Sequence, residues 1–205
     1  MPTLDRPAQG HKIEIPYAEV IRYLGGYHME ISPEAEALVR EGIDKISAAM
    51  DPRACYARFP ILHLDEEQVT LPCMDIHSRL LARHIAGCSE VILFAATIGA
   101  QTDRLIRGAE LLSPSRSAVL QAVGAAAIES YCNDLNDRLN REEDALGHLT
   151  RRRYSPGYGD FALTHQRDFF RVLECPVRLG ISLTEGMLMV PSKSVTALIG
   201  IETPQ

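Results

Sequence analysis

The sequence predicts an α+β fold in which helices flank an antiparallel sheet. Helical and extended patterns both occur, but they do not alternate regularly as a doubly wound parallel sheet requires. The uninterrupted apolar run EVILFAAT, at 90–97, is typical of a strand that is buried on both faces. Two further extended stretches, 187–190 and 195–201, are separated only by the turn-forming residues 191–194, which predicts an antiparallel hairpin.

The first half of the chain gives two helices and a pair of strands. Pro16 suits the first turn of a helix, and Gly25 and Gly26 suit its end. Ser32 precedes the second helix, whose apolar residues recur every three or four positions. We therefore expect a helix over 16–24, a helix over 33–50, a strand over 54–64 that is interrupted at Pro60, and a weak strand at 69–71.

The second half is dominated by one long helix. Apolar residues recur at helical spacing from Leu120 to Leu139, so this helix should run from about 116 to 144. After it, the pattern breaks into a basic loop that is rich in proline, glycine and tyrosine. The other predicted elements are a helix over 76–85, the strand 90–97, a helix that follows Gly99 and ends before Pro114, the loop 150–163, a helix over 165–173 and the two terminal strands.

Composition restricts the class of protein. A length of 205 residues suits a single domain, with residues 1–12 expected to form a flexible N-terminal tail. No stretch approaches the roughly 18 consecutive apolar residues of a membrane span, and no secretory signal is visible, so we expect a cytoplasmic protein without a membrane partner. Five scattered cysteines favour reduced thiols, and the net charge of −6 argues against nucleic acid as a partner.

The segment RYSPGYGD, at 153–160, is the part of the chain with the most promising binding chemistry. Pro156 and Gly157 force a turn, its two flanking tyrosines offer flat faces to a base or a cation, and Arg153 suits a carboxylate or phosphate. From spacing alone, a structural turn with a solvated arginine is the favoured interpretation. A basic loop that binds RNA, with 151–153, is a third interpretation, which the acidity of the chain disfavours. No acid–base or nucleophilic motif accompanies it.

This segment resembles the Arg-x-x-x-Gly-Tyr signature by which the reactivation domain of cobalamin-dependent methionine synthase binds S-adenosylmethionine. Arg153, Gly157 and Tyr158 match the signature, and Pro156 is also in the family's manner. Other matches to the family follow in the same order along 90–201: FAATIG at 94–99, the long helix, LTE at 183–185, MVP at 189–191 and SV at 194–195. The residues before 90 look more like the single-domain relatives of that family.

The resemblance implies a set of ligand-binding residues in this chain. The matching positions are Glu129, Arg153, Ser155, Gly157 and Tyr158, of which Ser155 and Gly157 would contribute backbone. The family's domain also has a ligand-facing tyrosine on a further strand, and we expect that contact to be absent or replaced here.

Glu129 has some support that is independent of the resemblance. On a helix, Ala125 and Ala126 lie one turn before it and Cys132 lies one turn after it. Such small neighbours leave space above the carboxylate, as the floor of a groove would. The alternative is an ordinary exposed helix glutamate.

The resemblance further implies the function. The protein would bind S-adenosylmethionine and support the reductive remethylation of cobalamin, acting as a component of methyl transfer and not as a self-contained enzyme. The cobalamin would be supplied by a partner, either a methionine synthase or another corrinoid protein, and the electron by a flavodoxin- or ferredoxin-type donor. The alternative is a docking or chaperone module for corrinoid proteins that has lost S-adenosylmethionine binding.

Overall fold

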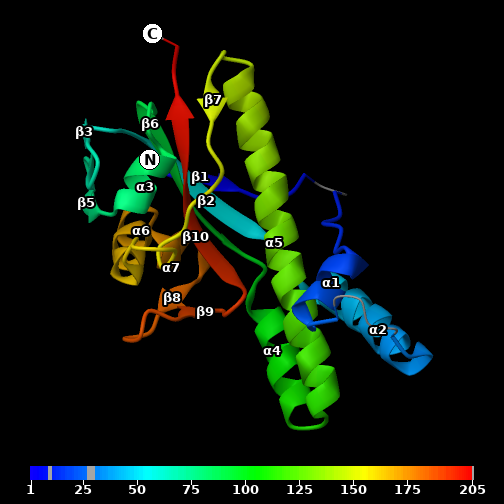
Figure 1. Ribbon diagram of the computed structural model, residues 1–205. Coiled ribbons are helices and arrows are strands. Elements are labelled where there is room, and N and C mark those ends of the chain that lie inside the picture. The colour runs from blue at the N-terminus through cyan, green and yellow to red at the C-terminus, as the bar shows by residue number, and fades with distance from the viewer. Residues whose placement is uncertain (9–10, 27–30, 205) are drawn as a thin grey trace.

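A five-stranded antiparallel sheet forms the centre of the molecule (Figure 1). The computed structural model describes residues 1–8, 11–26 and 31–204. The sheet has the order β1-β2-β6-β10-β7, with β1 Thr3–Asp5, β2 Arg53–Pro60, β6 Glu90–Thr97, β10 Ser194–Glu202 and β7 Leu149–Thr150. Its long central pair, β6 and β10, runs in register from Thr97 opposite Ser194 to Glu90 opposite Ile201. The predicted α+β fold with an antiparallel sheet is confirmed.

One face of the sheet is covered by the long helix α5 Pro114–Asp144, against which the other helices of this layer pack. These are α1 Tyr17–Tyr23, α2 Pro33–Ala49 and α4 Ala100–Glu110. Ile128 and Leu135 of α5 pack with Ile92 and Phe94 of β6 in the core of this layer. None of the described helices is both long enough and apolar enough to span a membrane.

The opposite face is covered by shorter elements. They are α3 Arg79–His84, a 3-10 turn Leu163–His165, α6 Gln166–Val172 and α7 Cys175–Leu179. Two small antiparallel sheets lie beside them: β3 His63–Leu64, β4 Gln68–Leu71 and β5 Met74–His77 form one, and β8 Ser182–Leu183 and β9 Met189–Val190 form the other. Phe169 and Leu173 pack here against Leu93 and Leu198 of the sheet.

Burial on both faces explains the sequence of β6. Alternate residues of a strand point to opposite faces: Ile92 and Phe94 enter the core under α5, while Val91 and Leu93 enter the other core. A strand between two helical layers has no solvent-facing side, so its sequence is apolar throughout.

The predicted terminal hairpin is wrong. β9 pairs with β8, whereas β10 pairs with β6 and β7. The connection between β9 and β10 is tied to α4, because Asp103 accepts hydrogen bonds from the backbone nitrogen (2.7 Å) and hydroxyl (2.9 Å) of Ser192. The chain therefore leaves β9 and enters the centre of the large sheet instead of folding back on itself.

Two further expectations differ from the structure. Ile76, predicted to begin a helix, lies in β5, and α3 begins at Arg79 after Ser78, whose hydroxyl accepts from the Leu81 nitrogen at 3.0 Å. Part of the segment 1–12, predicted as a flexible tail, forms β1, which pairs with β2.

Candidate functional site

Residues 151–160 form an irregular extension of the sheet beside β10. The Arg151 nitrogen donates to the Gly200 oxygen at 2.8 Å, and Tyr154 and Leu198 exchange two backbone hydrogen bonds of 2.9 Å. Figure 1 shows this yellow segment passing from β7 across β10 toward the α6 side of the sheet. We call residues 153–158 the signature segment.

The turn of the signature segment requires glycine. The Gly157 nitrogen donates to the Phe161 oxygen at 2.7 Å, and the Tyr158 nitrogen donates to the Ser155 oxygen at 3.1 Å. Gly157 has a φ of +93°, a conformation that other residues rarely adopt, and a Cβ there would lie 3.1 Å from Leu163 Cδ1. A side chain at this position would therefore meet both backbone strain and a close contact.

Asp160 fixes the far end of the turn to α3. Its carboxylate accepts hydrogen bonds from the Ser78 hydroxyl and from the Arg79 nitrogen, the latter at 2.8 Å. The Ser78 hydrogen bond and the backbone donors hold the pKa of Asp160 below its usual value. The segment is thus held at the start of α3, where unpaired backbone N–H groups favour a carboxylate.

Arg153 turns toward the opposite face of the sheet and contacts α5. Its Nη2 donates to Glu129 Oε2 at 2.5 Å, and its Nη1 donates to Asn133 Oδ1 at 2.8 Å. Glu129 and Asn133 are four residues apart and therefore lie one above the other on the same side of the helix. The structure thus brings together two of the predicted site residues, Glu129 and Arg153, and adds Asn133.

An aromatic cluster surrounds the turn. The Tyr154 ring stacks on Phe161 (6.3 Å between centroids) and meets Tyr158 edge-on (6.1 Å). Burial raises the pKa of Tyr154, which is the inner ring of the cluster. Tyr158 is 71% exposed, so it offers an aromatic surface to a molecule that approaches from outside.

Lys193, the residue before β10, contacts the same side of α5 about two turns before Glu129. Its Nζ donates to Gln121 Oε1 at 2.8 Å, and its stem covers Gly124, where a Cβ would lie 3.0 Å from Lys193 Cε. Burial lowers the pKa of Lys193. Gln121, Ala125 and Glu129 follow one another on the same side of the helix. Lys193 contacts Gln121 and Arg153 contacts Glu129, so only the small Ala125 side chain lies between these two basic residues.

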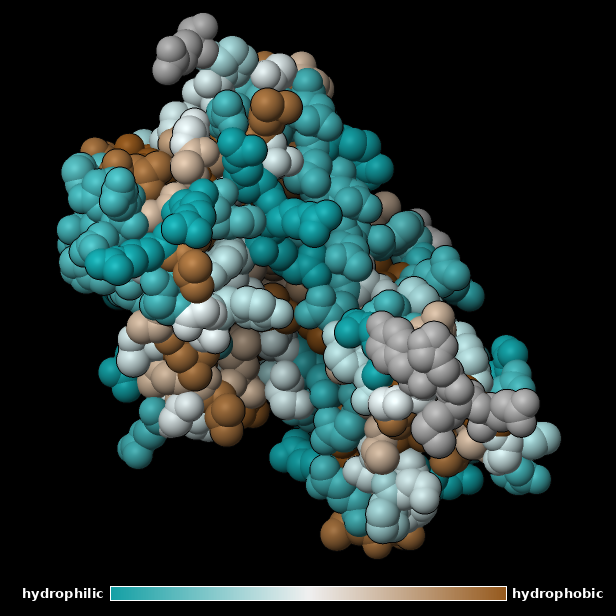
Figure 2. Space-filling view, in the orientation of Figure 1, coloured by the Kyte–Doolittle hydropathy of each residue, from teal (hydrophilic) through white to brown (hydrophobic). Residues whose placement is uncertain are grey.

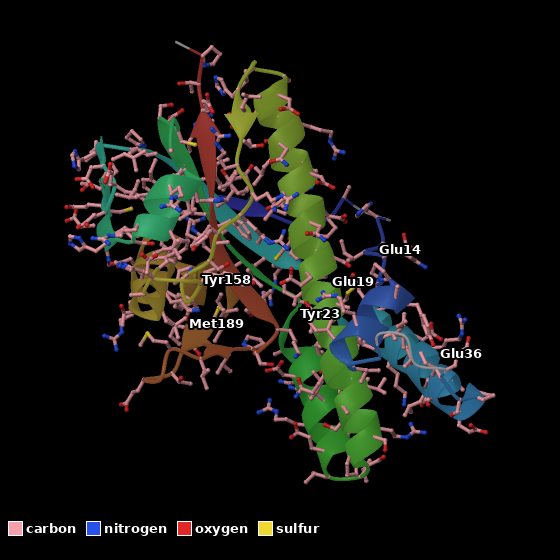
Figure 3. All side chains as sticks on the ribbon, viewed as in Figure 1. Glu14, Glu19, Tyr23, Glu36, Tyr158 and Met189 are labelled. Carbon is pink, nitrogen blue, oxygen red and sulfur yellow. The ribbon has the colours of Figure 1, made fainter. Side chains whose placement is uncertain are left out.

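Figure 2 shows a hollow in the surface between two parts of the molecule. The shorter elements around β8, β9 and α6 form one side of the hollow, and α4 and α5 form the other. Figure 3 labels Tyr158 and Met189 on the first side and Tyr23 of α1 on the other.

The chemistry of the site is that of binding. A carboxylate and a guanidinium in contact can receive the ammonium and carboxylate groups of an amino acid, and an exposed aromatic ring can stack on a base. Among the described residues, no group of three histidine, cysteine or carboxylate side chains could hold a metal ion.

Comparison with known proteins finds a solved structure with a similar fold. No protein-family model matches the sequence, and no curated protein matches it. A crystal structure of the MetH reactivation domain bound to AdoHcy is similar, with a TM-score of 0.70 and 17% sequence identity over 100% of this chain and 79% of that chain. This chain has the fold of the MetH reactivation domain.

The fold implied by the resemblance is thereby confirmed, and the individual site residues remain predictions. Arg153 and Glu129 are in contact, the Ser155 and Gly157 backbone is engaged in the turn that follows Arg153, and Tyr158 lies against Tyr154. Three residues that the sequence interpretation missed also shape the site: Asn133, Asp160 and Lys193. Asn133 could have been found from its spacing of four residues after Glu129 on a predicted helix.

Proposed function

We propose that this protein binds S-adenosylmethionine between the signature segment and α5, and that it supports the reductive remethylation of cobalamin held by a separate protein. That protein would be a methionine synthase or another corrinoid protein. The observation that carries the proposal is the contact between Arg153 and Glu129, made by a segment that also exposes Tyr158.

The paired charges suit the amino-acid end of this ligand. The α-carboxylate would take the planar fork of Arg153, whose side chain is 21% exposed, and the α-ammonium would take the Glu129 carboxylate, which is 41% exposed. Both groups are therefore reachable from solvent without unfolding the segment. Asn133 would keep the guanidinium oriented while its partner changes.

The aromatic and small residues suit the other end of the ligand. Tyr158 would stack on the adenine ring, since an aromatic face favours such contacts. Ala125 leaves room beside Glu129 on α5. The similar MetH reactivation domain is bound to AdoHcy, which supports a ligand of this class.

Methyl transfer from a sulfonium needs no protein acid or base, because the sulfonium is itself a good leaving group. One electron from a flavodoxin- or ferredoxin-type donor and the methyl group of S-adenosylmethionine would together restore the methylated corrinoid, releasing S-adenosylhomocysteine. The protein's residues would hold the sulfonium in line with the partner's cofactor and exclude water from the encounter. The hollow of Figure 2 offers a place for the partner to approach the ligand.

Titration calorimetry with S-adenosylmethionine tests the proposal. We expect saturable binding to the wild type, at least tenfold weaker binding to Arg153→Ala, and weaker binding to Tyr158→Phe if the hydroxyl also contacts the ligand. The matched control is Arg152→Ala, because Arg152 is a neighbouring exposed arginine. Absence of binding to the wild type, even with the corrinoid partner present, would reject the proposal.

The alternative function, a docking module without the ligand, gives a different result in a second experiment. Co-purification with a corrinoid methyltransferase should become stronger on addition of S-adenosylmethionine if the proposal is correct. Partner binding that is indifferent to S-adenosylmethionine and to Arg153→Ala would favour the docking module.

A further inference from the structure

A second candidate site lies between α2, α4 and α5, apart from the signature segment. These three helices surround a cavity of about 530 Å³, within the ~300–1,000 Å³ range of small-molecule sites. Its walls are mostly aliphatic and include Leu38, Leu105, Leu112 and Leu120. The proposed function makes no use of this cavity.

Two glycines explain why the cavity exists. At Gly42 of α2, a Cβ would lie 2.9 Å from Val119 Cγ1, so this glycine lets α2 approach α5 closely. At Gly108 of α4, a Cβ would meet no atom within 4 Å, so this position opens onto free space. The helices therefore touch at Gly42 and leave space at Gly108.

The mouth of the cavity exposes an unusual amount of apolar surface. Leu112, which lines it, is 84% exposed, and the adjacent Leu111 is 89% exposed. Figure 2 shows this apolar surface as the brown atoms at the lower end of the molecule, over the turn between α4 and α5. Exposed leucines beside an apolar cavity are typical of a surface that binds an apolar molecule.

The charges around the cavity select the kind of apolar molecule. Lys45, Arg104 and Arg116 lie around it together with a single acidic residue, Glu41. Glu41 already accepts from Lys45 at 2.7 Å and from Arg116 at 2.9 Å. No carboxylate of the described residues forms an ion pair with Arg104, which leaves an excess of positive charge beside an aliphatic wall.

We infer that this cavity binds a single-chain amphiphile with an anionic head group, such as a fatty carboxylate. The chain would lie along the leucines of α2 and α4 over Gly108, and the head group would contact Arg104 and Arg116. An arginine fork suits a carboxylate, and burial of the chain would supply most of the binding free energy.

Titration calorimetry with dodecanoate, kept below its critical micelle concentration, tests this inference. We expect saturable binding to one site, at least tenfold tighter than binding of dodecanol and of dodecyltrimethylammonium. Arg104→Gln should weaken dodecanoate binding about tenfold, as expected for the loss of one charge-assisted hydrogen bond, and should leave dodecanol binding unchanged.

A pair of variants at Gly108 locates the site. Gly108→Leu should fill the cavity and abolish dodecanoate binding, while Gly108→Ala should retain most of it, and both changes favour the helix. Arg153→Ala should bind dodecanoate like the wild type, which separates this site from the proposed S-adenosylmethionine site. Lack of saturable binding, equal affinity for all three head groups, or unaltered binding to Gly108→Leu would overturn the inference.

Discussion

Arg153 Nη2 donates to Glu129 Oε2 across 2.5 Å and so joins a loop beside β10 to the middle of α5. The two residues are 24 positions apart in the sequence. Their contact places opposite charges next to each other where both side chains remain partly exposed, and the same segment also exposes Tyr158. A pair in such a position can contribute little to stability and still be essential for binding.

Removing either charge should therefore affect binding and stability differently. Because Glu129 is 41% exposed, we expect Arg153→Ala and Glu129→Gln to lower the free energy of unfolding by less than about 1 kcal/mol. The same variants should bind S-adenosylmethionine at least tenfold more weakly, and Arg153→Lys should be impaired as well, because lysine lacks the planar fork. Urea denaturation and calorimetry on the same samples measure both quantities. Loss of binding that only follows loss of folded protein would contradict this prediction.

Asp160 should stabilise the protein in a pH-dependent way. Its pKa is held below the ordinary 3.8 by the Ser78 hydroxyl and the backbone nitrogens of α3. A carboxylate with a lowered folded-state pKa contributes stability that is complete above its unfolded pKa and is lost as the pH falls through the folded pKa. Asp160→Ala should therefore be less stable than the wild type at pH 7, and the difference should shrink in acid below pH 3.8.

Thermal unfolding from neutral to acidic pH measures this difference. The exposed Asp75, on the neighbouring β5, provides the control variant Asp75→Ala, for which we expect a smaller effect. A constant gap between Asp160→Ala and the wild type across this pH range would show that the carboxylate acts by packing and not by charge.

Asp5 should hold β1 in the sheet. Its carboxylate accepts from both terminal nitrogens of Arg138 at 2.6 Å and from the Tyr131 hydroxyl at 3.3 Å. Asp5→Ala leaves these donors unpaired, so we expect a loss of about 1–3 kcal/mol in the free energy of unfolding. Hydrogen exchange should become faster in β1 and in the facing part of β2. Tyr131→Phe, which removes only the weaker hydrogen bond, should have a smaller effect, and equal effects of the two variants would contradict the assignment.

Two Gly→Ala changes should have opposite effects on stability. A Cβ at the buried Gly200 of β10 would lie 2.8 Å from Cys88 Sγ and 3.0 Å from Ile85 Cγ2, so Gly200→Ala should cost about 1–3 kcal/mol. Gly108 in α4 has open space, so Gly108→Ala should stabilise the protein by about 0.5–1 kcal/mol through helix propensity. Urea denaturation of both variants checks the pair, and destabilisation by Gly108→Ala would contradict the open cavity.

The elements that were predicted correctly carry their signal within one segment of sequence. β6 could be predicted because burial on both faces requires an apolar run, and α5 because its apolar residues recur at helical spacing. The partner of β10 could not be predicted in the same way. A turn at 191–194 favours a hairpin locally, but the bonds from Ser192 to Asp103 of α4 direct the chain elsewhere.

The candidate site shows the same limit. Glu129 and Arg153 are site residues implied by the resemblance, and the structure shows that their side chains are in contact. Lys193 and Asp160 carry no such local signal. Lys193 enters the site only because Gly124 lets its stem lie against α5, and Asp160 only because the start of α3 faces the turn.

The attachment of Tyr154 to Leu198 has a consequence for solubility. β10 is apolar over most of its length, and a strand of this kind with a free edge readily pairs with other chains. β7 and the signature segment cover part of that edge. Changes that detach the signature segment from β10 would therefore expose a strand edge that is prone to aggregation. Selection against aggregation and selection for the proposed ligand binding would then act on the same few residues.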